Sequence, residues 1–384
     1  MKLTRGDWVH LLLLWLGGLD IRLTMLAVPP LIPLIHRDMH LDEKAVGALV
    51  SLPVVLLAVA AVPGSLLIAK LGIRAALVIG LGAVAVFGAL RGAGSSATIL
   101  FSATFLMGAG VAVSQPAFPA LVREWFPRRI AVATAVFSNG VLVGETIPTV
   151  FTTPFGVLPA AHGDWRIALA TWSVLVGLTA MGMAAAAPSG RGATAAPTRW
   201  WPSWLEGQVL RVGTVMGMAS AVYFGANAYI PDFLDQSGRH DLISPTLAVL
   251  NASQLLTAPA VALWDKVLTG RAGFVGSAAL MIVAQLGLVL TPGVGVVAWA
   301  FVLGFSTALA FVVVLTLPPR LAAPGDVHRM SAAIFTLQYA TAFVLPLVAG
   351  ALWDATGQAS LAFVPGLLGA GLMAWLALPL KLPD

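Results

Sequence analysis

The sequence predicts an all-α integral membrane protein with twelve transmembrane helices in two pseudo-symmetric six-helix bundles. Three observations predict this class. Hydrophobic residues make up 59% of the 384 residues and charged residues only 10%, whereas soluble domains carry about 25% charged residues. Apolar runs of about 20 residues, the length that crosses a bilayer as a helix, recur along the whole chain. The two halves of the chain also repeat one another at a fixed offset.

Twelve apolar segments account for the predicted helices. We expect an N-terminal bundle over residues 1–187 and a C-terminal bundle over residues 209–384. The segment 188–208 between them is rich in Pro, Gly, Ala and Thr, which is typical of a linker, here on the cytoplasmic side. The expected spans are 8–35, 44–69, 74–93, 97–122, 130–157, 165–187, 209–234, 243–268, 272–290, 294–318, 328–352 and 357–380.

The positions of the Lys and Arg residues predict which helix ends face the cytoplasm. With the N-terminus inside, 15 of the 21 fall on the inner side and 5 on the outer side, Arg91 among them, while Arg22 stays within the membrane. Because cytoplasmic loops are enriched in Lys and Arg, we expect both termini in the cytoplasm, in a bacterial inner membrane. The net charge of +5 is therefore a topology signal, and we expect no nucleic-acid partner.

The two halves match at a constant offset. Duplicated six-helix halves are a common plan for transporters, with the substrate site near the bilayer midplane. The matched pairs, each 198 residues apart, are Pro33 with Pro231, Gly72 with Gly270, Ala135 with Ala333 and Phe137 with Phe335.

The loop after the eighth span, ALWDKVLTGRAGF, resembles the acid-base-glycine loop of the major facilitator superfamily (MFS). Asp265, Lys266 and Arg271 stand in the places of that motif. An acid there can accept a hydrogen bond from a neighbouring helix N-terminus and pair with a base, so we expect a conformational latch. An ordinary positively charged loop is the alternative, and in the first copy Ala69 replaces the acid.

The fifth span combines small residues with a charge. Gly140 and Gly144 lie four apart, a spacing that lets two membrane helices approach closely. Glu145 follows, about fifteen residues from the inner end of its span, and Arg22 lies about fourteen residues from the inner end of the first span. Both charges are therefore expected near mid-bilayer.

An acid and a base share the first span in GGLDIRLTM. A charged residue at a helix centre costs about 2.5–3.5 kcal/mol on insertion scales, so such residues face the protein interior and find partners. Asp20 and Arg22 are two apart, about 200° around a helix, and point to opposite sides. One interpretation has Arg22 facing a cavity, with Glu145 as its counter-charge and Asp20 packed toward another helix. A purely structural ion pair of Arg22 with either acid is the alternative.

The C-terminal half offers neutral polar groups instead. Ser220 stands 198 residues after Arg22, and Phe343 198 residues after Glu145. Amides and phenols can hydrogen-bond a small polar solute without adding charge, although each one alone is more often an interhelical contact. The candidates are Tyr223, Asn227, Tyr229, Asn251, Gln254, Gln338 and Tyr339.

Three segments together resemble the cyanate-permease and nitroimidazole-transporter branch of the MFS. They are LGGLDIRLTMLAVPPLIPLIHRDMHLDEKAVGALVSLP, VYFGANAYIPDFL and RMSAAIFTLQYATAFVLPLVAGALWDATG. The resemblance implies a substrate role for Arg22 and, more loosely, for Gln338 or Tyr339. The branch usually has an amide in place of Asp20, and Glu145 is not part of its pattern. The resemblance also implies a monomer that handles small anions or small nitrogen heterocycles.

We therefore expect a secondary transporter that moves a small organic anion or compact polar solute by alternating access. Glu145 or Asp20 could take up a proton and couple transport to the proton gradient. The chain has no phosphate-binding loop for ATP, no cysteine and no histidine cluster at mid-depth, so we expect no cofactor and no metal. A proton-driven exporter of lipophilic or cationic drugs is the alternative, and an integral membrane enzyme a remote one.

Overall fold

The computed structural model describes residues 4–28, 31–40, 49, 52–53, 55–59, 61–94, 96–152, 160, 162–187, 201–268, 270–323 and 326–379. Within these ranges the chain is helical and contains no β-strand. Eleven helices in this part are long and apolar enough to cross a membrane. The all-α membrane class is therefore confirmed. Of the expected second span, 44–69, the structure describes residues 49, 52–53, 55–59 and 61–69, and its C-terminal part is the shorter apolar helix α4 (Ala61–Leu71).

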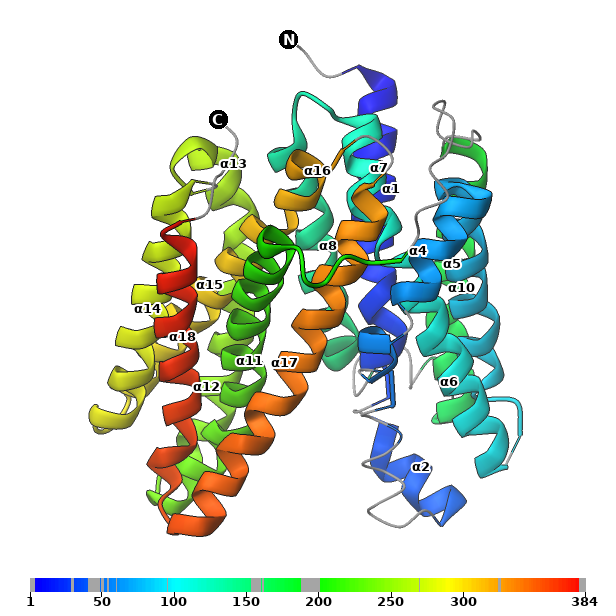
Figure 1. Cartoon of the computed structure of the whole chain (residues 1–384). Helices are drawn as coiled ribbons and strands as arrows, with labels where there is room; N and C mark the ends of the chain where they lie inside the picture. The colour runs from blue at the N-terminus through cyan, green and yellow to red at the C-terminus, as the bar shows by residue number, and fades with distance from the viewer. Residues whose placement is uncertain are drawn as a thin grey trace. The chain divides into compact units, whose positions relative to one another are not determined.

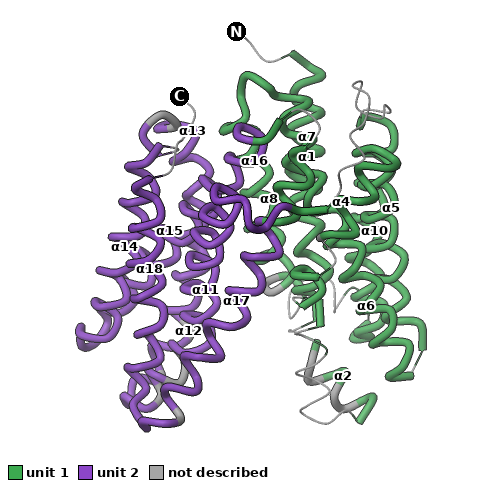
Figure 2. The backbone as a smooth tube through the Cα atoms, viewed as in Figure 1, with its two compact units in different colours: residues 1–202, 322–333 green, residues 203–321, 334–384 purple. Residues whose placement is uncertain are grey.

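The chain divides into two compact units (Figures 1 and 2). Unit 1 comprises Met1–Pro202 with Ala322–Ala333, and unit 2 comprises Ser203–Leu321 with Ile334–Asp384. Residues 188–200 of the expected linker lie outside the described part, so the linker at 188–208 stays a prediction.

Unit 1 contains the expected first six spans. Two of them are each divided into two helices. The expected first span, 8–35, contains the end of one helix at Leu26 and the start of a short helix at Ile32. The fourth span is interrupted at Pro116, after which a new helix starts. Besides α4, the helices are α1 (Arg5–Leu26), α2 (Ile32–Met39), α5 (Ile73–Leu90), α6 (Ala97–Ser114), α7 (Ala117–Trp125), α8 (Ile130–Phe151) and α10 (Trp165–Ala186).

Unit 2 contains the later spans, and the first turns of its helix α17 group with unit 1. The α-helices are α11 (Gly207–Gln236), α12 (Ile243–Ser253), α13 (Thr257–Leu268), α14 (Arg271–Leu290), α15 (Gly295–Leu315), α16 (Leu317–Leu321), α17 (Val327–Thr356) and α18 (Val364–Ala377). The short 3-10 turns are η2 (His240–Leu242), η3 (Gln254–Leu256) and η4 (Ala359–Phe363).

In unit 1, α1 and α8 pack backbone against backbone (Figure 1). A Cβ atom on Gly140 would overlap the carbonyl oxygen of Trp15, and one on Gly144 would overlap that of Leu19. Both contacts join residues 125 positions apart, so the two helices run parallel. The glycine pair thus brings α8 close enough to α1 for side chains at one depth to meet.

Unit 2 repeats this pairing with the small residues on the other helix. A Cβ atom on Gly213 of α11 would crowd Leu337 of α17, and one on Gly217 would crowd Thr341. Gly213 stands 198 residues after Trp15, and Gly217 stands 198 residues after Leu19. The close parallel contact is therefore common to both halves, while the partner that supplies the small residue has changed.

Two other paired features follow the same offset. Pro148 lies inside α8 and Pro346 inside α17, 198 residues apart. Gly72 and Gly270 each stand directly before a helix, at the N-cap positions of α5 and α14. Gly72 has a φ of 90°, which glycine adopts without the steric penalty that a Cβ atom adds.

Arg91, which the orientation count places on the outer side, has a buried side chain, with 1% of the residue exposed. Its Nη2 donates to the carbonyl of Thr24 at 2.7 Å and its Nε to that of Gly88 at 3.3 Å. These carbonyls belong to the last turns of α1 and α5, where a cation satisfies oxygens that lack intrahelical donors. Arg91 therefore caps two helices at once.

The short helix α2 is held to the start of α10. The Asp38 carboxylate accepts a hydrogen bond from Trp165 Nε1 at 3.0 Å and pairs with Arg166 at 2.7 Å. The bond from Trp165, with that from Arg166, holds the pKa of the Asp38 carboxyl below its ordinary value. The same segments share an apolar core, whose buried members are Ala27, Val28, Leu31, Ile35, Leu49, Leu100, Trp165, Ala168 and Leu169.

Candidate functional site

The structure brings Arg22 and Glu145 together inside unit 1. Arg22 Nε lies 3.2 Å from Glu145 Oε1, and the two side chains are 8% and 17% exposed. Glu145 follows Gly144 directly, and Gly144 sits on the backbone of Leu19, one turn before Arg22. The close glycine contact therefore sets the two charges opposite each other. Arginine and carboxylate in this environment form a charge-assisted contact within a neutral pair.

A second polar contact joins the same helices one to two turns nearer the N-terminus of α1. Trp15 Nε1 donates to Asn139 Oδ1 at 2.9 Å. Trp15, Leu19 and Arg22 lie on one face of α1, since residues three and four apart are neighbours on a helix. This face of α1 is turned toward α8.

Asp20 lies on a different face of α1. Leu13 and Gly17, which share that face, contact Gly182 and Met183 of α10. The side chain of Asp20 is fully buried. In the part of the chain that the structure describes, neither of its carboxylate oxygens accepts a hydrogen bond. Asp20 is thus separated from the Arg22–Glu145 pair by the helix itself.

A polar group of α10 lies beside Asp20. The hydroxyl of Thr179 approaches the carboxyl group, yet it donates to the carbonyl of Leu175 at 3.2 Å. A buried polar group that lacks a full set of hydrogen bonds is costly, so Asp20 is an unusual residue to find between two packed helices.

In unit 2, Ser220 and Gln338 join α11 to α17 by a polar contact. Gln338 Nε2 on α17 donates to Ser220 Oγ on α11 at 2.9 Å, and both residues are buried. Ser220 stands 198 residues after Arg22. Gln338 stands 198 residues after Gly140 and five residues before Phe343, the counterpart of Glu145. Each half therefore joins its parallel helices with a polar contact that includes the Arg22 or Ser220 position, charged in one unit and neutral in the other, while the second partner comes from a different position. Tyr339, the next residue, is also buried, with 1% exposed.

Asn251 of α12 is the centre of a second polar group in unit 2. Its Oδ1 accepts hydrogen bonds from Tyr223 Oη at 2.7 Å and from Gln254 Nε2 at 3.3 Å. Its Nδ2 donates to Asn227 Oδ1 at 3.1 Å and to the Leu247 carbonyl at 2.9 Å. An asparagine amide has two donor hydrogens and two acceptor lone pairs. All four positions of Asn251 are occupied, so it supports its neighbours rather than offering a group to a solute.

The direction of these hydrogen bonds is fixed by backbone carbonyls. Because the Leu247 carbonyl can only accept, Asn251 must turn its Nδ2 toward it and its Oδ1 toward Tyr223 and Gln254. Those two residues must then donate to Asn251. Asn227 is oriented in the same way, since its Nδ2 donates to the Tyr223 carbonyl at 3.0 Å. The amide of Gln254 therefore turns its NH2 group toward Asn251.

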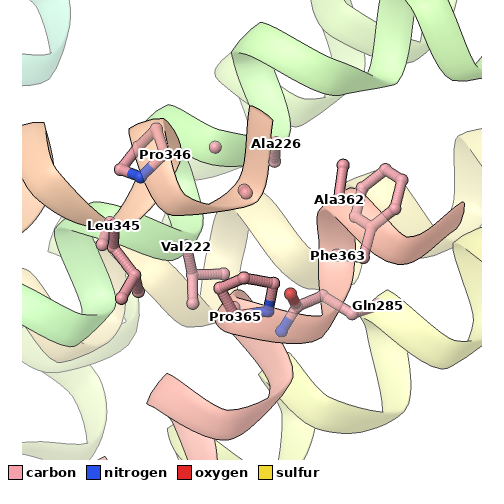
Figure 3. A pocket seen from close by; sticks show the side chains of 12 residues that line it. Val222, Ala226, Gln285, Leu345, Pro346, Ala362, Phe363 and Pro365 are labelled. Carbon is pink, nitrogen blue, oxygen red and sulfur yellow. The ribbon is translucent and has the colours of Figure 1, made fainter. Parts of the chain in front are cut away.

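The remaining candidate on α11, Tyr229, braces α17. Its hydroxyl donates to the carbonyl of Pro346 at 2.6 Å, and its ring lies 5.9 Å from that of Trp353. Pro346 also lines a cavity of about 10 Å³ in unit 2, which holds about one water molecule (Figure 3). The amide of Gln285 is the polar side chain labelled there, beside Pro365 (Figure 3). This cavity is too small for an organic solute.

The predicted latch is described only in part. The side chains of Asp265 and Lys266 lie outside the described residues. Arg271 is exposed at the first position of α14. The latch therefore stays a prediction. Among the residues that the structure describes, no group of three His, Cys, Asp or Glu side chains is arranged to hold a metal ion.

Comparison with known proteins gives consistent results across the chain. The family model of the Major Facilitator Superfamily matches residues 14–346. The cyanate transport protein CynX of Escherichia coli (strain K12) is 25% identical over 91% of this chain and 91% of its own length. The uncharacterized transporter YycB of Bacillus subtilis (strain 168) is 23% identical over 88% of this chain and 84% of its own. Two solved structures have a similar fold. The human organic anion transporter MFSD10 has a TM-score of 0.77 and 13% identity, and the match covers 97% of this chain and 99% of that one. The MFS transporter FucP in the outward conformation has a TM-score of 0.74 and 14% identity, and the match covers 97% of this chain and 99% of that one.

Proposed function

Because the chain belongs to the Major Facilitator Superfamily, we propose that it is a secondary active transporter of a small organic anion or compact polar solute that works by alternating access. Membership of the family makes it a multi-pass membrane transporter, and proteins of this family are generally not enzymes. The class of solute and the mode of coupling are our proposal.

The observation that carries the proposal is the charged pair in the middle of α1. Arg22 is almost buried and lies against Glu145. Arginine within a membrane span is rare and marks substrate or ion pathways when it occurs. Its guanidinium presents several donors in a planar fork that suits carboxylates and other oxyanions. In surroundings of low dielectric constant its charge acts more strongly than it would in water.

The similarity to CynX supports an anionic solute. That relative is a cyanate transport protein by name, and cyanate is a small anion. Arg22 offers such an ion a positive charge, whereas it would repel a cation. We therefore assign the substrate role first to Arg22.

The polar group around Asn251 supports a solute that also carries hydrogen-bond donors. Gln254 commits an amide hydrogen to Asn251, and Tyr223 commits its hydroxyl hydrogen to the same oxygen. In the described part of the chain, no hydrogen bond ends on the Oε1 atom of Gln338, which is buried. We propose Tyr223, Asn227, Gln338 and Tyr339 as the neutral substrate contacts, each polar group acting within unit 2.

The remaining assignments complete the proposal. We place the protein in the bacterial inner membrane with both termini in the cytoplasm, as a monomer that requires no cofactor. We assign proton coupling to a carboxyl group of α1 or α8, with Glu145 and Asp20 as the two candidates. We assign the cytoplasmic latch to Asp265, Lys266 and Arg271.

A thermal-shift screen of detergent-purified protein tests the solute class. The panel contains formate, acetate, cyanate, nitroimidazoles and a lipophilic cation, each measured on wild type, Arg22→Ala and the exposed control Arg211→Ala. A ligand that binds the folded state raises the melting temperature. We expect anions to stabilise wild type and Arg211→Ala but not Arg22→Ala. Stabilisation by the lipophilic cation alone would instead favour a drug exporter.

A further inference from the structure

We propose that the buried carboxylate of Asp20 binds a sodium ion between α1 and α10, with the hydroxyl oxygens of Thr24 and Thr179 as further ligands. The inference goes beyond the proposed function, because it concerns an ion held inside unit 1 rather than the transported solute. It leaves Glu145 as the candidate for proton coupling. The expectation of no metal came from the absence of cysteine and of a histidine cluster. Sodium uses neither ligand, since hard cations prefer oxygen.

The carboxylate of Asp20 has no cation paired with it among the described residues. Its side chain is fully buried, and within the described ranges neither carboxylate oxygen accepts a hydrogen bond. Arg22, two residues further on, is paired with Glu145. Arg91 donates to backbone carbonyls at the ends of α1 and α5. Because a buried ionised carboxylate is costly unless it is paired, an ionised Asp20 requires a cation from outside the chain.

Thr24 supplies a further oxygen beside Asp20. It follows Asp20 by one helical turn, so both side chains project from the same face of α1. Thr24 is fully buried, and its Oγ1 has no hydrogen-bond partner in the part of the chain that the structure describes. A Cβ atom on Gly88 of α5 would lie 3.5 Å from the methyl group of Thr24, so the methyl group is the branch that meets α5. The two carboxylate oxygens and this hydroxyl therefore lie on one face within one turn.

The opposing helix α10 presents a hydroxyl oxygen to the same place. The hydroxyl of Thr179 approaches the Asp20 carboxyl group, but it donates its hydrogen to the carbonyl of Leu175 at 3.2 Å. A hydroxyl whose hydrogen is committed to the backbone offers lone pairs to its other neighbours. The lone pairs of Thr179 and of an ionised Asp20 repel one another unless a cation lies between them. The arrangement therefore suits a bound cation.

The charge and the packing of the site favour sodium among the common cations. A single carboxylate balances one positive charge, whereas a divalent cation would leave an excess charge in a buried place. The ion must also be small, because α1 and α10 pack directly on each other about one turn away, where a Cβ atom on Gly17 would lie 3.3 Å from Met183 Cε. Sodium is smaller than potassium. Once bound, it holds α1, which carries Arg22 on another face, against α10.

Thermal melts of detergent-purified full-length protein test the site. The melting temperature is measured as NaCl replaces choline chloride at constant total salt and pH 7.5, with KCl as a parallel series. A ligand that binds only the folded state adds stability with the logarithm of its concentration above its Kd. We expect wild type to gain an equal step in melting temperature for each tenfold increase in Na+, with no such gain in KCl. Equilibrium binding of radioactive sodium should give about one ion per chain.

Four variants locate the ion. Asp20→Asn removes the charge, so it should lose the sodium response. In choline chloride it should melt no lower than wild type, which then holds an unpaired buried charge. Thr24→Val and Thr179→Val each remove one oxygen and keep the shape of the side chain; we expect half-saturation at about tenfold more NaCl or higher, because even the outer partners of metal ligands contribute that much. Asp241→Asn, at an exposed position of unit 2, should match wild type.

Two results on folded protein would overturn the inference. A wild-type melting temperature that changes equally in NaCl and KCl, or in neither, shows that no sodium site exists. An undiminished sodium response in Asp20→Asn places the ion elsewhere. If Asp20→Asn does not fold, the two valine variants decide, because a wild-type sodium response in both removes the proposed ligands and with them the site. These measurements include no transported solute, so a failure here leaves the anion proposal standing.

Discussion

Arg22 and Asp20 show how strongly two neighbouring charges can differ in their surroundings. Because they lie two residues apart on α1, one faces Glu145 of α8 and the other faces α10. The 200° rotation and the cost of a charge in the membrane predict this arrangement from sequence. The substrate and coupling roles of these residues stay predictions. The fully buried state of Asp20, with the Thr179 hydroxyl approaching its carboxyl group, depends on packing that the sequence does not display.

Arg91 provides a stability test at the residue scale. Arg91→Leu removes the donors to the Thr24 and Gly88 carbonyls, and an unsatisfied buried carbonyl costs about 1–3 kcal/mol. We expect a lower melting temperature in detergent, a smaller loss for Arg91→Lys, and no loss for Arg211→Leu, which alters an exposed residue. Equal melting temperatures for Arg91→Leu and wild type would contradict the double helix cap.

Asp38 provides a test that depends on pH. Since the pKa of its carboxyl is held below the ordinary value of 3.8, ionised Asp38 stabilises the fold above that pH, and the stabilisation disappears as pH falls through the lowered pKa. Asp38→Asn should therefore melt earlier than wild type at pH 7 and alike at strongly acid pH. Thermal melts across this range measure the difference, with the exposed Asp241→Asn as control. A difference that grows toward acid pH would refute the assignment.

At the scale of helices, the parallel pairs α1–α8 and α11–α17 each pack closely at two glycines. The spacing of Gly140 and Gly144 predicts close packing of the fifth span, and the structure shows this packing against α1. The equivalent contact of unit 2 was not predicted, because its glycines lie on the first helix of the pair rather than the second. Pro148 and Pro346 are also 198 residues apart, so this proline pair is a further sign of the repeat in the sequence, in addition to the four matched pairs.

The glycine contacts give a matched set of substitutions. Gly140→Val and Gly213→Val introduce side chains where another residue already lies, and overpacking costs about 1–3 kcal/mol or more when backbones must separate. Gly82→Val and Gly276→Val, whose surroundings are open, serve as controls. We expect the first two variants to melt well below the controls. Melting temperatures that do not distinguish the two sets would show that the helix pairs are loosely packed.

The polar group around Asn251 marks a limit of sequence reasoning. Tyr223, Asn227, Asn251 and Gln254 are all recognisable as polar residues in apolar spans. The hydrogen bonds that make Asn251 the central residue depend on how α11 and α12 are rotated against each other. Periodicity does not determine that rotation in a helix that is apolar on most sides.

For the whole molecule, the sequence alone predicts the all-α class and the family. Composition, apolar span length and the repeat lead to a duplicated membrane protein, and the family comparison and the structure agree. The orientation in the bilayer follows from the distribution of Lys and Arg along the chain and stays a prediction.

The absence of cysteine in the sequence makes the orientation easy to test. Ser96→Cys lies before α6, at the expected outer side, and Arg128→Cys lies between α7 and α8, at the expected inner side; both positions are exposed. In intact cells, a membrane-impermeant maleimide should label the first variant and not the second, and permeabilised cells should label both. The reverse pattern would place both termini outside.

The most direct test of the central claim compares anion affinity in three forms of the protein. Cyanate and formate are titrated by calorimetry into wild type, Arg22→Gln and the double variant Arg22→Gln/Glu145→Gln. The double variant lacks both charges of the pair, so it separates the loss of the Arg22 charge from the loss of the partner of Glu145. If Arg22 anchors the anion, wild type binds and both variants lose the binding. If the double variant binds as tightly as wild type, Arg22 only pairs with Glu145 for stability, and the proposed anion site is wrong.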